Sequence, residues 1–98
     1  MKSATERIVN HKTEFLKYLK SRFQLFHLSN LFFRDLHYGV ISYLKEHGSP
    51  VGYAEAESIA RELGETFERG GIFKKIDHQS WLLQYPEFAL PRIEKKAS

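Results

Sequence analysis

The sequence predicts a single, mainly α-helical domain that is closed by a small β-hairpin near its C-terminus. Three observations predict this α+β class. Apolar residues recur at helical spacing from Ala4 to Arg69, the period changes to two after Gly71, and no linker divides the 98 residues. The apolar fraction of 42% is typical of a folded chain, so we expect residues 1–98 to form one domain around one core.

A long first helix is predicted over about residues 4–28. Ser3 and Glu6 have the spacing of a capping box, in which each side chain accepts a backbone N–H of the other residue. The apolar stripe that follows consists of Ile8, Phe15, Leu16, Leu19, Phe23 and Phe26. At about 1.5 Å per residue this helix would be about 37 Å long, which is long for the body of so small a domain.

Two further helices follow, each with its own stop signal. The second is predicted over about residues 31–47, with Asn30 able to cap its start and Gly48 placed to end it. The third is predicted over about residues 53–69, and Gly70 ends it. Its buried face is predicted to consist of Ala56, Ile59, Ala60, Leu63 and Phe67.

A two-residue period over residues 72–85 predicts the hairpin. We expect Ile76 to lie opposite Trp81, because this register pairs a β-branched residue with an aromatic one. The turn lacks glycine, which favours a four-residue loop over residues 77–80 rather than a two-residue loop.

The end of the chain is expected to return to the helices and then to fray. Phe88 and Leu90 are predicted to pack on the core, and the polar residues 92–98 are predicted to form a frayed tail. A core of two helices and a hairpin therefore covers about residues 31–90.

The sequence offers no candidate residues for catalysis, cofactor binding or metal binding. Cysteine is absent, which excludes disulfides, thiolate metal sites and thiol catalysis. The five histidines have no metal-ligand spacing, and neither a nucleophile motif nor a glycine-rich phosphate loop is present. We expect a protein that is not an enzyme and needs no cofactor. Without a signal peptide or a run of about 18 apolar residues, it is expected to be cytoplasmic.

The element order, with two helices before a hairpin, is that of a winged helix, which often binds DNA through its last helix. The charge of the third predicted helix speaks against that use. Its two arginines stand against five glutamates, a net charge of −3, and carboxylates weaken binding to phosphates. The glutamates are Glu55, Glu57, Glu62, Glu65 and Glu68. Direct DNA binding is therefore the less favoured interpretation.

The chain also resembles a DEP domain over about residues 33–88. The motifs that carry the resemblance are Ile41-Ser-Tyr-Leu44, Glu55-Ala56, Ile59-Ala60, Leu63, Gly70-Gly71-Ile72 and the stretch from Trp81 to Phe88. Tyr43 stands where the family has a tryptophan. The chain departs from the family pattern in its long first helix and in the short break at residues 29–30, which leaves no room for the β-hairpin arm of DEP domains.

The resemblance implies a non-catalytic signalling module that docks on a protein partner or on an anionic membrane surface. In DEP-like domains such docking uses basic and exposed apolar residues. The nearest candidates in this sequence are Lys74 and Lys75 on the hairpin, together with Lys45. Solvated charges on an edge strand are the structural alternative for the two hairpin lysines.

The long first helix leaves three interpretations open. It could pack across the other two helices, pair with a second copy to give a homodimer, or lie on a membrane as a basic amphipathic helix. The residues predicted for self-association are Phe15, Tyr18, Leu19, Phe23 and Phe26. The alternative function is that of a winged-helix nucleic-acid-binding protein or transcriptional regulator, using the first helix or the hairpin.

Overall fold

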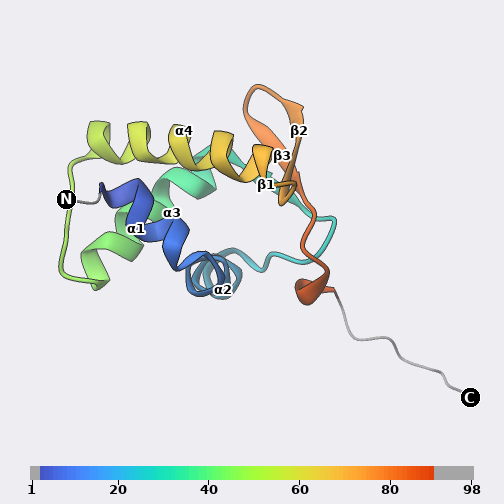
Figure 1. Ribbon diagram of the computed structural model, residues 1–98, viewed down its shortest axis with the longest axis horizontal. Coiled ribbons are helices and arrows are strands. Elements are labelled where there is room, and N and C mark those ends of the chain that lie inside the picture. Colours follow the sequence, from blue (N-terminus) through green and yellow to red (C-terminus); the bar gives the residue numbers. More distant parts are fainter. Residues whose placement is uncertain (1–2, 90–98) are drawn as a thin grey trace, which may run out of the picture.

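The computed structural model describes residues 3–89 and consists of four helices with a small antiparallel sheet at one end of them (Figure 1). The helices are α1 (Ala4–Asn10), α2 (Lys12–Phe23), α3 (Phe33–Glu46) and α4 (Tyr53–Arg69). The strands are β1 (Asn30–Phe32), β2 (Phe73–Asp77) and β3 (Ser80–Leu83), and a short 3₁₀ helix, η1 (Pro86–Phe88), follows them. The predicted α+β class, mainly helical, is confirmed. Leu90 and the predicted tail at residues 92–98 lie outside the described residues.

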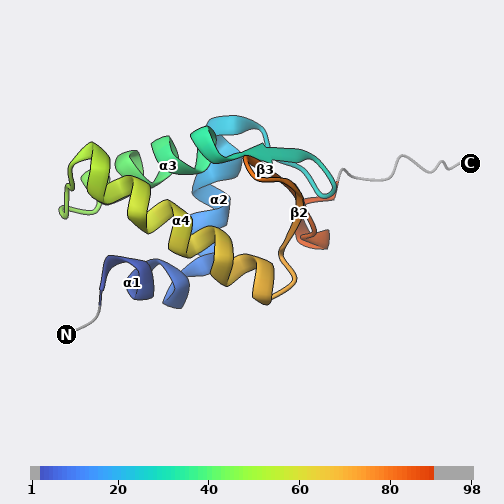
Figure 2. The ribbon, with the colours of Figure 1, turned by 90° about the horizontal axis from the view of Figure 1, so that it is seen from above.

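The prediction of one continuous helix over residues 4–28 is wrong. The capping box of Ser3 and Glu6 starts α1 as expected, but His11 (φ −120°, ψ 41°) interrupts the helix. After this residue the chain turns, and α2 ends at Phe23 because Gln24 adopts a left-handed conformation (φ 54°). The reason is packing: α1 contacts α4 while α2 contacts α3, and a straight rod could not reach both (Figures 1 and 2).

The second helix begins later than predicted, because residues 30–32 form strand β1. Leu31 lies opposite Trp81 in an antiparallel ladder, so the predicted two-stranded hairpin is a three-stranded sheet of order β1-β3-β2. Asn30 is part of this strand and does not cap α3. Pairing with β1 satisfies the second edge of β3, which would otherwise carry unpaired backbone groups.

The hairpin register also differs from the prediction. Trp81 lies opposite Lys75, and the irregular residue Ile76 is 52% exposed. Asp77 pairs with Ser80, so the turn has two residues and the predicted four-residue loop is absent. The Asp77 carboxylate explains this without glycine, because its Oδ1 accepts the backbone N–H of Gln79 (2.8 Å) and the Ser80 hydroxyl (2.9 Å). These two bonds hold the pKa of Asp77 below its ordinary range.

Helix α4 has the predicted bounds and lies between the other helices and the sheet. All five residues of its predicted inner face are buried, and Phe88 packs on the core as expected. The ring of Trp81 covers Gly64, where an added Cβ would come within 2.6 Å of Trp81 Cζ2. Phe73 lies against the same indole, with ring centroids 5.2 Å apart. The sheet therefore rests on α4 through aromatic contacts, of which that of Trp81 requires glycine in the helix and that of Phe73 meets Phe67 at 5.1 Å.

Substitution of Gly64 tests this contact. Gly64→Ala gains about 1 kcal/mol of helix propensity, but it overpacks the indole at a cost of about 1–3 kcal/mol. We expect a net loss of about 1 kcal/mol in the free energy of unfolding, measured by urea titration. The exposed Ser58 on the same helix supplies the control Ser58→Ala, which should not lower stability. Stabilisation by Gly64→Ala would contradict the close packing.

Candidate binding groove

The residues predicted for self-association do not form a free surface. Phe15 and Leu19 are 0% exposed and belong to the core of the chain itself. Tyr18, Phe23 and Phe26 are partly buried, and the ammonium of Lys20 lies 4.7 Å from the Phe26 ring centroid. The aromatic residues of α2 are therefore used mainly to hold this helix on α3.

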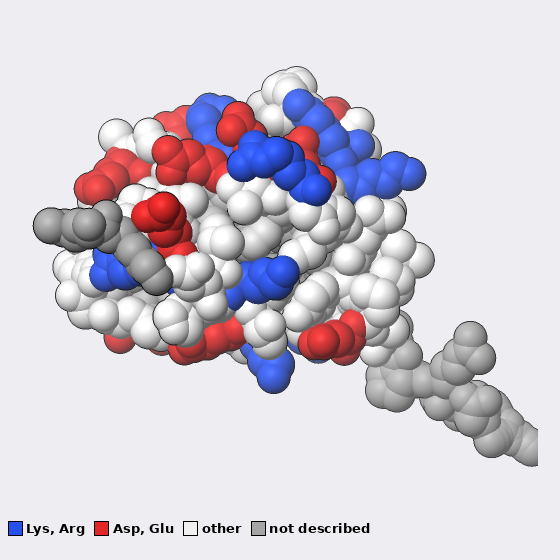
Figure 3. All heavy atoms as spheres, in the orientation of Figure 1, with Lys and Arg blue, Asp and Glu red and all other residues white. Residues whose placement is uncertain are grey.

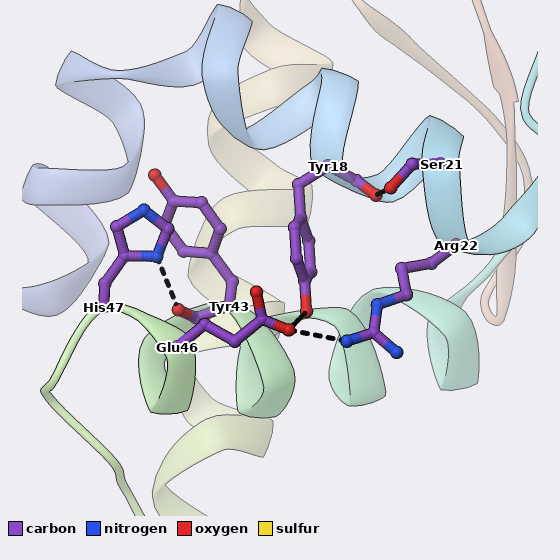
Figure 4. A network of polar contacts seen from close by, with 6 residues as sticks. All are labelled: Tyr18, Ser21, Arg22, Tyr43, Glu46 and His47. Carbon is purple, nitrogen blue, oxygen red and sulfur yellow. Dashed lines mark hydrogen bonds and ion pairs between the residues drawn. The ribbon is translucent and has the colours of Figure 1, made fainter.

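A polar network on the surface completes the contact between α2 and α3 (Figure 4). Glu46 on α3 accepts hydrogen bonds from the Tyr18 hydroxyl (2.9 Å) and from Arg22 (2.6 Å), both on α2. Burial and the bond to Glu46 raise the pKa of Tyr18, whereas the hydrogen bonds from Tyr18 and Arg22 lower the pKa of Glu46. The Tyr18 ring also meets Tyr43 edge-on at 5.4 Å. The network therefore joins α2 to α3.

His47 ends this network with two hydrogen bonds. Its Nδ1 donates to the Tyr43 carbonyl at 2.8 Å, and its Nε2 lies 3.2 Å from Oε2 of Glu14 on α2. Both ring nitrogens carry a proton only in the imidazolium form. The Tyr43 carbonyl first, and Glu14 second, therefore raise the pKa of His47 above its ordinary value of 6.5.

The raised pKa of His47 predicts a pH-dependent contribution to stability. The folded state favours the imidazolium, so the contribution is fully present below the unfolded pKa of 6.5 and is lost as the pH rises through the folded pKa. The difference in unfolding free energy between the wild type and His47→Gln should shrink between about pH 5 and about pH 9. Glu14→Gln should lower the His47 pKa in an NMR titration. A wild-type pKa at or below 6.5 would contradict the assignment.

The three predicted lysines are exposed but do not form one surface. Lys45 lies near the end of α3, whereas Lys74 and Lys75 lie on the edge strand β2 at the other end of the molecule (Figure 1). Lys74 and Lys75 are consecutive residues of a strand, so their side chains project from opposite faces of the sheet. The structure thus brings none of these residues to a shared pocket.

A groove of about 590 Å³ lies instead where the starts of α3 and α4 meet the turn of the hairpin. We call it the aromatic groove. Its lining consists of Phe32, Phe33, Arg34, His37, Tyr53, Glu57, Arg61, His78 and Gln79. The hairpin turn is fixed to this place because the backbone N–H of Phe33 donates to the Gln79 carbonyl at 2.8 Å. Three segments far apart in the sequence therefore build one concavity.

Large aromatic side chains of the groove are open to solvent. Phe32 is 52% exposed and Tyr53 is 62% exposed, and Tyr38, beside the groove, is 46% exposed. Buried His37 supports Tyr53: its Nε2 donates to the Tyr53 carbonyl at 2.9 Å, and its ring lies 4.3 Å from that of Tyr53. Tyr53 is thus held in place without being covered, and Phe32 is exposed in the same groove, which is typical of recognition surfaces.

Of the two arginines in the groove, Arg61 is paired with a carboxylate and Arg34 is not. Arg61 pairs with Glu57 at 2.9 Å, and its guanidinium lies 4.9 Å from the ring centroid of Phe33. Arg34 is exposed and forms no ion pair within residues 3–89. Counting Arg34, Arg61 and Glu57, the groove carries a net charge of +1 with neutral histidines.

Sequence reasoning missed this groove. It placed Phe32 and Phe33 within the second predicted helix, over about residues 31–47, and gave them no role in a site, although both line the groove. The available signal was a surplus of aromatic residues at the start of the second helix, together with Tyr53 lying off the apolar stripe of the third. Neither shows which segments meet.

Neither a metal site nor a membrane-spanning helix is found among the described residues. Across residues 3–89, no three His, Asp or Glu side chains are grouped so that they could hold a metal ion. In the same range, none of the helices combines the length and apolar character needed to cross a membrane.

Comparison of the chain with protein-family models, curated proteins and solved structures finds no match.

Proposed function

We propose that this chain is a non-catalytic interaction module that docks on a partner protein through the aromatic groove. The observation that carries the proposal is the pair of exposed aromatic side chains, Phe32 and Tyr53, in one preformed concavity. Burying such side chains is favourable, and aromatic residues with arginine are enriched where proteins meet.

We further propose that the module is a winged helix of DEP-like type. Support comes from the order of elements, in which β1 precedes α3 and α4 and the hairpin of β2 and β3 follows, with β3 central in the sheet. Tyr43, which stands for the family's tryptophan, is buried against Phe15 with ring centroids 5.0 Å apart. A signalling role and a cytoplasmic location belong to this same proposal.

Other docking surfaces are less well supported. An anionic membrane could meet Lys74 and Lys75 on the hairpin, but Lys45 lies too far away to join them. A homodimer through α2 would lack Phe15 and Leu19, which the chain's own core already covers. The groove is favoured because its exposed groups lie together.

Selection of peptides from a random displayed library tests the docking function. Peptides that are enriched on the wild-type chain should lose binding to the double variant Phe32→Ser with Tyr53→Ser, because both exposed aromatic surfaces disappear. The matched control is Ile76→Ser, which removes an equally exposed apolar side chain (52%) outside the groove. Failure to enrich any peptide, or loss of binding only in the control, would contradict docking through the groove.

The alternative of nucleic-acid binding is favoured by the winged-helix order but opposed by the charge of α4. Exposed residues of this helix include Glu55, Glu62 and Glu65, and Figure 3 shows acidic side chains gathered along α4, with basic ones over the hairpin. A helix with this charge would meet the phosphates of a duplex with carboxylates.

Binding to random duplex DNA decides between these functions. We expect none at about 50 mM salt in a fluorescence anisotropy titration. Micromolar binding that is lost steeply by about 200 mM salt would support the nucleic-acid function, and Lys74→Glu with Lys75→Glu would then show whether the hairpin is responsible.

A further inference from the structure

We infer that the ligand of the aromatic groove is an extended segment of a partner protein in which a carboxylate side chain lies close to an aromatic or large aliphatic one. This inference rests on the proposed docking function and names the chemical class of its ligand. It requires that the groove offer both a free cation and an uncovered apolar surface, at a separation that one short peptide can span.

Arg34 supplies the free cation. Its guanidinium is exposed, and within the described residues it forms no ion pair. Arg61 differs, because Glu57 neutralises it at 2.9 Å and its guanidinium covers the Phe33 ring. One arginine is therefore committed to the wall of the groove, and the other is left to meet an anion. A guanidinium matches a carboxylate with two parallel hydrogen bonds.

Phe32 and Tyr53 supply the apolar surface. They come from β1 and from the first turn of α4, and both line the same groove as Arg34. Arg34 is only two residues from Phe32 in the chain, so a ligand that covers the phenyl ring passes within reach of the guanidinium. The two kinds of contact are thus neighbours, which suits adjacent apolar and acidic residues in a ligand.

The charges around the groove favour a peptide over a polyanion. Glu57 lies in the lining itself, and Arg34 is the one arginine there that has no carboxylate partner among the described residues. A peptide can place a single carboxylate on Arg34 and keep uncharged residues elsewhere. A nucleic-acid strand carries a phosphate at every nucleotide, and an anionic membrane presents a continuous sheet of charge, so both would also bring negative charge next to Glu57.

Fluorescent octapeptides of matched composition test the inference by anisotropy. The first carries a tryptophan next to a glutamate in an otherwise Gly/Ser sequence. The others replace the glutamate by glutamine, the glutamate by lysine, or the tryptophan by alanine. We expect the first peptide to bind most tightly, with an affinity about two- to fivefold above that of the glutamine peptide, as for an exposed ion pair.

Reversing the charge of Arg34 tests whether this residue contacts the glutamate of the peptide. Arg34→Glu should lower the affinity for the tryptophan–glutamate peptide about tenfold and should make the lysine peptide the better ligand. Lys45→Glu is the matched control, because it changes the net charge equally at an exposed site far from the groove, and it should leave the preference for glutamate intact. Circular dichroism verifies that both variants are folded.

The outcomes separate the two proposals. If the glutamine peptide binds as tightly as the glutamate peptide and Phe32→Ser with Tyr53→Ser abolishes both, docking in the groove stands and the acidic preference is overturned. If no peptide binds at millimolar concentration, the docking function fails as well. A deoxythymidine dodecamer or phosphatidylserine vesicles could instead bind more tightly than the tryptophan–glutamate peptide and lose this binding in Arg34→Glu. That result would overturn the acidic peptide as the ligand in favour of the nucleic acid or the membrane.

Discussion

The rest of this fold depends on the contact between the indole of Trp81 and helix α4. Its strand is central in the sheet, so Trp81 lies opposite Leu31 on one side and Lys75 on the other. The ring covers Gly64, and its Nε1 donates to Oε2 of Glu68 at 2.6 Å, so the sheet is tied to α4 by both packing and a directed hydrogen bond. A buried indole N–H without such an acceptor would be costly. This side chain, together with the packing of Phe73 on Phe67, therefore fixes where the hairpin lies relative to α4.

The position of the hairpin in turn creates the aromatic groove. With β3 held on α4, the two-residue turn reaches the start of α3, where the Gln79 carbonyl accepts the N–H of Phe33 at 2.8 Å. The strand that precedes α3 is then extended, which leaves Phe32 on the outside. The Phe32 ring is exposed because β1 pairs with β3 in a register that buries Leu31 and turns its neighbour Phe32 outward. The backbone of the groove is thus fixed at this point by the fold itself.

Sequence reasoning succeeded where a local pattern decided the outcome. Helix α4 has the predicted bounds because Gly52 and Gly70 flank a strong apolar period. The break at His11 and the strand β1 have no local signal, since each is fixed by distant contacts with α4 or β3. The hairpin register depended on the Asp77 side chain, which stabilises a tight turn that composition alone argued against. For the site, a groove assembled from three segments of the chain could not be predicted from any one of them.

In the proposed docking function, the Glu57 carboxylate within the lining adds selectivity by exclusion. Arg34 alone would attract any anion, including phosphate and lipid headgroups. Glu57 raises the free energy of a ligand that extends its negative charge along the groove beyond one group. A ligand that places a single carboxylate on the Arg34 guanidinium and makes apolar contacts elsewhere avoids this repulsion. The charge of α4 that argues against reading DNA and the single unpaired arginine of the groove both favour, under this proposal, a protein partner.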